Sequence, residues 1–211
     1  MKCAYNVQGN LANLAAYSAE SRHQLLQARK EAVDAILSGE RCPFRRVPAY
    51  EKTVEQHRTV RGRYNFCVVE GESKTGKTTW AKHGTGVDPS QVFYTNCNSC
   101  QEPDLRNLDP LIHKICVCDE AHPQLVLNYK EVFQSQNEWI RLGTSQTNCH
   151  SYEVMLQGMI FIILSNKWSE ELNGLQPSDK SWILKNQFYT RIYSNPLFLV
   201  EGQDASGHSF V

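Results

Sequence analysis

The sequence has no long apolar run, no excess of charge of either sign and no internal repeat. Its best apolar segment, 159–164, is far too short to span a bilayer, and residues 1–20 lack the apolar core of a signal peptide. We therefore expect a soluble, intracellular protein with no membrane partner. The formal net charge of +0 argues against a strongly basic nucleic-acid binder, although charge can still cluster locally.

The composition predicts a packed globular protein. The chain has 211 residues, of which 41% are hydrophobic and 21% charged, and this suits one domain with a short appendage. Apolar residues at three- and four-residue steps predict a helix over 11–38, and the proline- and charge-rich stretch 41–63 reads as a linker. We expect a helical segment and linker at 1–60, which could help assembly, and a globular domain at 61–211.

From residue 64 the pattern changes to short apolar strands separated by helices. Strands are expected at 64–70, 92–95, 114–119 and 159–165, with later ones at 189–193 and 197–200. One helix is expected to start with residues 77–83, and a second helix is expected to cover 124–140. Alternating strands and helices favour an α/β fold, a three-layer α/β/α sandwich around a parallel sheet.

A glycine-rich motif follows the first of these strands. Residues 71–78 match G-x-x-x-x-G-K-[ST] in full, in the strand-to-helix context that this P-loop (Walker A) requires. Its glycines let backbone N–H groups face phosphates, and the helix N-terminus adds a favourable dipole. Lys77 is expected to reach the β- and γ-phosphates of ATP, and Thr78 to bind Mg²⁺. The expected nucleotide-binding residues are Gly71, Glu72, Ser73, Lys74, Thr75, Gly76, Lys77, Thr78 and Thr79.

Two further strands end in polar residues that suit the same chemistry. The apolar strand at 114–119 ends in Asp119 and Glu120, the pattern of a Walker B motif. Asp119 is expected to hold Mg²⁺ and Glu120 to act as general base toward the attacking water. The strand at 159–165 is followed by Asn166, which could orient that water or cap its own turn.

These three motifs together resemble a superfamily-3 helicase of the P-loop, AAA+-like type. The resemblance is to the helicase domain of replication-associated (Rep) proteins of small circular single-stranded DNA viruses and their relatives, over about residues 61–200. It implies that Asn166 is the sensor and that the segment 143–148, with Arg141 and His150 at its base, forms a DNA-facing hairpin. It also implies an arginine finger that acts on a neighbour's ATP, for which Arg191 is the best candidate.

The resemblance implies an ATP-driven DNA helicase that works in DNA replication as an oligomer, with a ring threaded by single-stranded DNA and, for a viral protein, a place in the host nucleus. The chain departs from the family in two ways. Residues 1–60 hold no His-hydrophobe-His motif with a nucleophilic tyrosine, so nicking and joining activity is not expected. The expected hairpin also contains no lysine.

Other interpretations fit less of the sequence. Residues 119–122 spell D-E-A-H, the box of superfamily-2 RNA helicases. Those proteins need a second P-loop-like domain, and too few residues follow His122 for one. Residues 166–169 resemble the guanine-reading N-K-x-D motif, except that position 169 is serine. A stand-alone P-loop ATPase or a small-molecule kinase remains open, although an arginine-rich lid is not evident, and so does an ATP-gated assembly module that does not hydrolyse ATP.

The cysteines allow two interpretations, a metal site or core residues. Cys97 and Cys100 form a C-x₂-C pair, and Cys116 and Cys118 follow in the chain, so the group could hold zinc. Cys116 and Cys118 lie within an apolar strand, however, where cysteine commonly serves as a small core residue.

Overall fold

The computed structural model describes residues 44–98, 102–143 and 151–193, together with Gln24, Gln27 and Leu197. Within these residues the main sheet has five parallel strands in the order β2-β3-β6-β1-β7, and β4 pairs with β5 in a separate antiparallel ribbon. The strands are β1 (Phe66–Gly71), β2 (Val92–Asn96), β3 (Ile115–Asp119), β4 (Trp139–Leu142), β5 (Tyr152–Met155), β6 (Ile160–Ser165) and β7 (Gln187–Ile192). The strands predicted near 64–70, 92–95, 114–119, 159–165 and 189–193 are confirmed.

Successive side chains of the central strands enter two separate cores. Phe66 and Val68 of β1 pack into one core, and Cys67 and Val69 pack into the other. All of β6 is buried, because it lies between β1 and β3 and is covered on both faces. A continuous apolar strand is therefore what this position requires.

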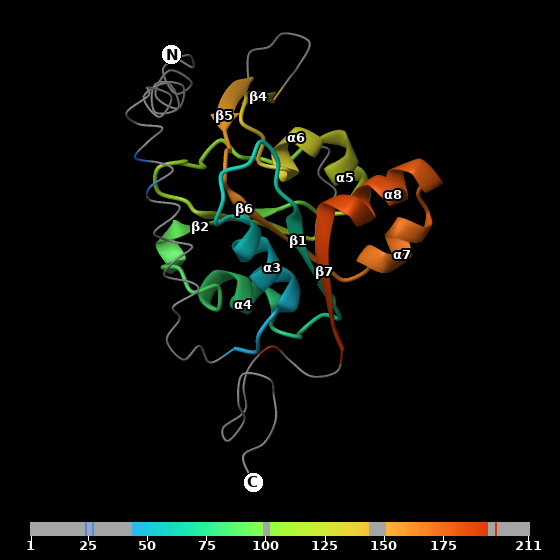
Figure 1. The fold of residues 1–211 in the computed structure, drawn as a ribbon. Coiled ribbons are helices and arrows are strands. Elements are labelled where there is room, and N and C mark those ends of the chain that lie inside the picture. Colours follow the sequence, from blue (N-terminus) through green and yellow to red (C-terminus); the bar gives the residue numbers. More distant parts are fainter. Residues whose placement is uncertain are drawn as a thin grey trace, which may run out of the picture.

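Helices cover both faces of the sheet (Figure 1). Residues of α3 and α4 pack into one core, and residues of α5 to α8 pack into the other. The helices are α3 (Pro48–Gln56), α4 (Lys77–His83), α5 (Pro123–Asn128), α6 (Lys130–Phe133), α7 (Trp168–Asn173) and α8 (Pro177–Asn186), with a 3₁₀ turn η1 at Pro89–Gln91. The predicted α/β/α three-layer sandwich is confirmed.

Helix α3 lies where the sequence suggested a linker. Pro48 occupies the first helical turn, where a missing N–H costs nothing, and so the proline starts the helix rather than breaking it. Ala49, Tyr50 and Val54 are buried in the core beside β1. The interpretation of 41–63 as a linker is therefore wrong where α3 forms. The residues between the charged positions of α3 are buried, as they are in a helix that packs on a core.

The long helix predicted over 124–140 is also wrong. The chain forms α5, then leaves the helical range at Tyr129, forms the short α6, and then enters β4. Ile140 and Leu142 are buried on either side of the exposed Arg141 and pair with β5, so their apolar pattern fits a strand equally well.

The remaining sequence predictions fall partly outside the described residues. Gln24 and Gln27 are helical, and the rest of 11–38 is not described. At 197–200 only Leu197 is described, and it lies in a bend. The division into 1–60 and 61–211 remains a prediction. In the part of the chain that is described, no helix is long and apolar enough to cross a membrane.

Candidate nucleotide site

The P-loop connects the end of β1 to the start of α4. Gly76 caps α4 with φ 83°, a left-handed conformation that glycine adopts without strain. Gly71 lies against β7, because a Cβ at this position would meet the Cβ and carbonyl oxygen of Ile192 at 3.0 Å. The loop is closed further by hydrogen bonds from the Thr75 hydroxyl to the Glu72 carbonyl and from the Leu197 N–H to the Thr75 carbonyl. These two glycines thus have structural reasons to be glycine.

Lys77 is buried at the start of α4 and has three hydrogen-bond acceptors. Its ammonium group donates to the carbonyl oxygens of Gly71 at 2.7 Å and Glu72 at 2.9 Å, and to Oδ1 of Asn166 at 2.9 Å. Burial lowers the pKa of Lys77, while Glu120, Asp119 and Glu70 oppose that shift. The Lys77 ammonium group is therefore held beside the P-loop by hydrogen-bond acceptors that phosphate oxygens could replace.

Thr78 and Asp119 lie side by side, as a Mg²⁺ site requires. The Thr78 hydroxyl donates to Oδ2 of Asp119 at 3.0 Å, and the N–H of Glu120 donates to Oδ1 at 3.1 Å. Mg²⁺ is a hard cation that binds oxygen ligands, and a hydroxyl and a carboxylate both supply them. The donor set at the end of β3 therefore fits the metal that the sequence predicted.

Asn166 connects the P-loop to the acidic pair. Because β6 lies between β1 and β3, its end brings Asn166 between Lys77 and Glu120. The Asn166 amide accepts from Lys77 through Oδ1 and donates from Nδ2 to Oε1 of Glu120 at 2.8 Å. Glu120 itself has φ 56°, an uncommon conformation for a residue with a side chain. The three motifs found in the sequence are thus one hydrogen-bonded group.

Tyr94 belongs to this group, although no motif in the sequence marked it. Its hydroxyl donates to Oδ2 of Asp119 at 2.6 Å, and the ammonium group of Lys82 lies 3.9 Å from its ring centroid. Burial, followed by the hydrogen bond to Asp119, raises the pKa of Tyr94. Only the pairing of β2 with β3 brings this tyrosine to the Walker B carboxylate, and sheet order cannot be obtained from one sequence.

Glu70 is a second residue that the motifs did not reveal. It is 2% exposed at the end of β1, and it accepts hydrogen bonds from the backbone and hydroxyl of Ser169 and from the Tyr189 hydroxyl. Arg191, paired with Glu70 in the strand register, places its Nε 4.0 Å from the carboxylate, and its side chain is 49% exposed. Arg191 therefore lies at the same edge of the sheet as the P-loop and reaches Glu70 of the same chain.

The other predicted positions surround this centre. Glu72, Ser73, Lys74 and Thr79 are exposed on the loop and the first turn of α4. His122 caps α5, since its Nδ1 accepts the N–H of Leu125 at 3.3 Å. Cys97 is buried, Cys100 lies outside the described residues, and no group of three or more potential metal ligands of the His, Cys, Asp or Glu type occurs among the residues described.

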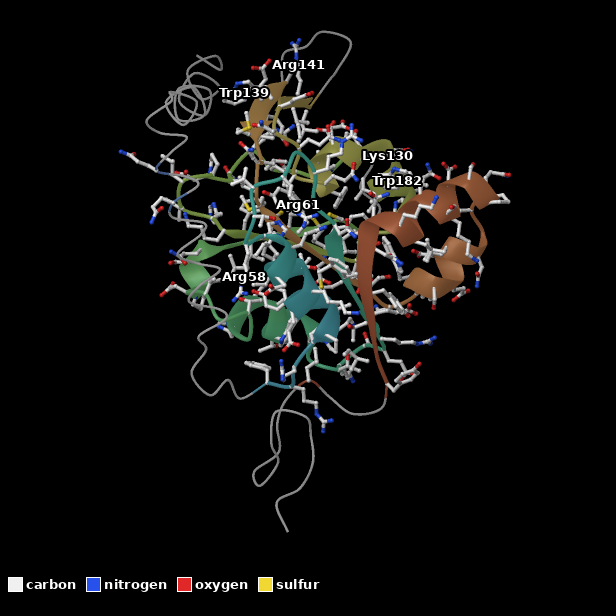
Figure 2. All side chains as sticks on the ribbon, in the orientation of Figure 1. Arg58, Arg61, Lys130, Trp139, Arg141 and Trp182 are labelled. Carbon is white, nitrogen blue, oxygen red and sulfur yellow. The ribbon has the colours of Figure 1, made fainter. Side chains whose placement is uncertain are left out.

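The β4–β5 ribbon lies on the side of the domain away from the candidate nucleotide site. Since β5 leads through a short turn into the start of β6, the ribbon adjoins the amino edge of the sheet, while β7 runs away from it (Figure 1). Arg141 lies on the exposed face of β4 and donates to the Ser151 hydroxyl at 3.1 Å, and Figure 2 shows it with Trp139 at this end of the molecule. Of the predicted hairpin, 144–150, including His150, lies outside the described residues.

The fold and the site define a protein of the P-loop NTPase class: a parallel sheet between helices, with a complete phosphate-binding loop between the buried strand β1 and α4. No protein-family model matches the chain.

Among solved structures, the chain is similar to the S. cerevisiae Hsp104–ADP complex, with 17% identity and a TM-score of 0.45. It is also similar to a closed state of Hsp104 with ATPγS and casein, with 16% identity and a TM-score of 0.38. The matches cover 84% and 80% of this chain but only 37% and 31% of those chains. Neither likeness is strong enough to support an argument about function.

Proposed function

We propose that this protein is a Mg²⁺-dependent ATPase, and that it works as a superfamily-3-type DNA helicase. The observation that carries the first part is the chain of hydrogen bonds from Lys77 through Asn166 to Glu120. It joins a cation suited to phosphate, a polar sensor and a carboxylate suited to a general base within one hydrogen-bonded cluster.

Each of these residues has a role in the proposed reaction. Lys77 and the loop backbone would hold the β- and γ-phosphates, and Thr78 and Asp119 would hold Mg²⁺, which would supply positive charge to the phosphates. Glu120 accepts a proton from the attacking water, and Asn166 positions that water. Asn166 contacts both Lys77 and Glu120. Binding of the γ-phosphate would therefore rearrange these contacts and free the Glu120 carboxylate to act as the base.

Arg191 is proposed to complete the site of a neighbouring subunit in a ring. Half of its side chain is exposed at the edge of the sheet that carries the P-loop, which leaves the guanidinium group accessible to another subunit. A positive charge at the transferred phosphate stabilises the charge that develops there. Glu70 would hold Arg191 in place from within its own subunit.

The proposed substrate of the motor is single-stranded DNA, and the support for it is the β4–β5 ribbon. The inner face of the ribbon is anchored by Ile140, Leu142 and Val154 in the core, while Arg141 and part of Trp139 lie outside it. Aromatic and arginine side chains are typical contacts for bases and phosphates of single strands. A hairpin at this place in the chain is also what the resemblance to Rep helicase domains implies.

Steady-state ATP hydrolysis tests the proposal directly. The purified chain should hydrolyse ATP only with Mg²⁺, faster when single-stranded DNA is added, and with a steeper-than-linear dependence on protein concentration. Hydrolysis that ignores both DNA and concentration would favour a stand-alone ATPase. Phosphate transfer to a small acceptor in place of water would favour a kinase.

A further inference from the structure

Four side chains near the end of β3 form a ring of contacts that two hydrogen bonds, one cation–π contact and the backbone of α4 complete. Thr78 and Lys82 are four residues apart and so share one face of α4. Thr78 contacts Asp119, Lys82 lies over the ring of Tyr94, and the Tyr94 hydroxyl returns to Asp119. The ring of contacts thus links α4, β2 and β3 around one carboxylate.

Three hydrogen bonds hold the Asp119 carboxylate. Oδ2 of Asp119 accepts from both Thr78 and Tyr94, at 3.0 and 2.6 Å, and Oδ1 accepts from the Glu120 N–H. A carboxylate on an aspartate can otherwise turn about its last bond with little cost. The Tyr94 contact is the shortest of the three, and it comes from an edge strand that carries none of the nucleotide motifs.

We propose that Tyr94 is a positioning residue for metal binding, whose hydroxyl fixes the Asp119 carboxylate so that Oδ2 faces Thr78. Lys82 holds the Tyr94 ring in place through a cation–π contact. This inference rests on the proposed Mg²⁺-dependent ATPase. It adds to the site a residue that acts through Asp119 rather than on the nucleotide.

The hydroxyl has two opposing effects on the metal, and their sizes decide the outcome. Its hydrogen bond withdraws negative charge from the carboxylate, which weakens the attraction to a cation. It also orients the carboxylate before the metal arrives, and partners that orient ligands typically contribute about 10–100-fold in metal affinity or activity. Because Asp119 is 7% exposed, a misplaced carboxylate finds little water to hold it, and we expect orientation to dominate.

The test compares Tyr94→Phe with the wild-type chain, using Mn²⁺ as a spectroscopic probe in the presence of ADP. Mn²⁺ affinity measured by electron paramagnetic resonance should fall about 10-fold, while ADP affinity in EDTA should change less than about twofold. The affinity of Tyr94→Phe for Mg²⁺, measured by displacement of subsaturating Mn²⁺, should fall by a similar factor. Lys82→Met should lower Mn²⁺ affinity in the same direction by a smaller factor, because the Tyr94 ring loses its support.

Tyr129→Phe is the matched control, since Tyr129 also donates to a carboxylate, that of Glu102 at 3.3 Å, outside this ring of contacts. It should leave Mn²⁺ affinity unchanged. Unchanged Mn²⁺ affinity in Tyr94→Phe, with or without a lower melting temperature, would show a merely structural role and overturn the inference. Higher affinity would overturn it as well, because the hydroxyl would then compete with the metal. A wild-type chain that binds no Mn²⁺ with ADP would remove this inference and the proposed ATPase together.

Discussion

The carboxyl edge of the sheet and the β4–β5 ribbon use their polar groups in different ways. At the carboxyl edge, Lys77 and Asp119 are buried and each has several fixed partners. On the ribbon, Arg141 is exposed, contacts only a serine hydroxyl among the bonds described, and lies opposite Glu153. Burying a charge is costly unless it is paired, so the first arrangement is specific to one ligand chemistry. The second arrangement is solvated and can adapt to varied partners.

The comparison explains why the two regions should respond differently to mutation. A buried group with several partners cannot be removed without leaving others unsatisfied, so its loss affects the chemistry sharply. An exposed arginine is one of several contacts, and its loss changes affinity in small steps. The four predictions below test this contrast, from the largest expected effect to the smallest.

Glu120→Gln should separate binding from turnover. The amide keeps the size of the side chain and can still contact Asn166, but it cannot accept the proton of water. We expect ATP affinity within about threefold of wild type and a fall in kcat of about 10²–10⁴, the usual contribution of a general base. Glu131→Gln, an acidic residue on α6, is the control and should leave kcat unchanged. Normal turnover in Glu120→Gln would mean that another group is the base.

Lys77→Ala should remove nucleotide binding. The ammonium group would contribute charge-assisted hydrogen bonds to phosphate, each worth about 1.5–3 kcal/mol, so loss of two predicts a fall in ATP affinity of at least about 100-fold. Binding of a fluorescent ATP analogue measures this directly. Lys52→Ala, at an exposed lysine of α3 outside the loop, is the control and should bind nearly normally. Equal loss in both variants would contradict the special place given to Lys77.

Mixing two inactive variants tests whether Arg191 acts on a neighbour. Arg191→Ala subunits keep Lys77, and Lys77→Ala subunits keep Arg191, so a mixed ring would contain some complete sites. Random equimolar mixing makes about a quarter of the interfaces complete, and activity should recover toward that fraction. Failure to recover at every ratio would indicate that Arg191 acts within its own subunit, through the contact with Glu70.

The sequence was enough to predict which polar residues meet at the carboxyl edge but not their supporting contacts. Lys77, Asp119 and Asn166 were found because each follows an apolar strand, and the carboxyl ends of parallel strands meet at one edge. Glu70 was missed because its partners Ser169 and Tyr189 are 99 and 119 residues away. Tyr94 was missed for the same reason, since its role depends on which strand lies beside β3.

The errors in secondary structure have local causes. Pro48 suggested a linker because proline breaks the interior of a helix, yet here it occupies the first turn of α3, where it is favoured. The apolar residues at 139–142 fit a helix and a strand alike, and pairing with β5 decides for the strand. The ribbon was expected only from the resemblance to helicase domains, because no turn motif in the sequence marked it.

Arg141→Ala should have the smallest effect, and it tests the adaptable side of the comparison. If Arg141 contacts a DNA phosphate, its loss should weaken binding of single-stranded DNA about equally for all sequences and lower the salt slope by about one. DNA binding measured by fluorescence anisotropy over a range of salt concentrations gives both quantities. Basal ATP hydrolysis should stay unchanged, because the ribbon adjoins the amino edge of the sheet and the candidate nucleotide site lies at the carboxyl edge. Lys185→Ala, on α8 and apart from the ribbon in Figure 1, is the control for the loss of one exposed charge. An identical salt slope in wild type and Arg141→Ala would exclude a phosphate contact by Arg141, and the ribbon would then need another partner than the DNA backbone.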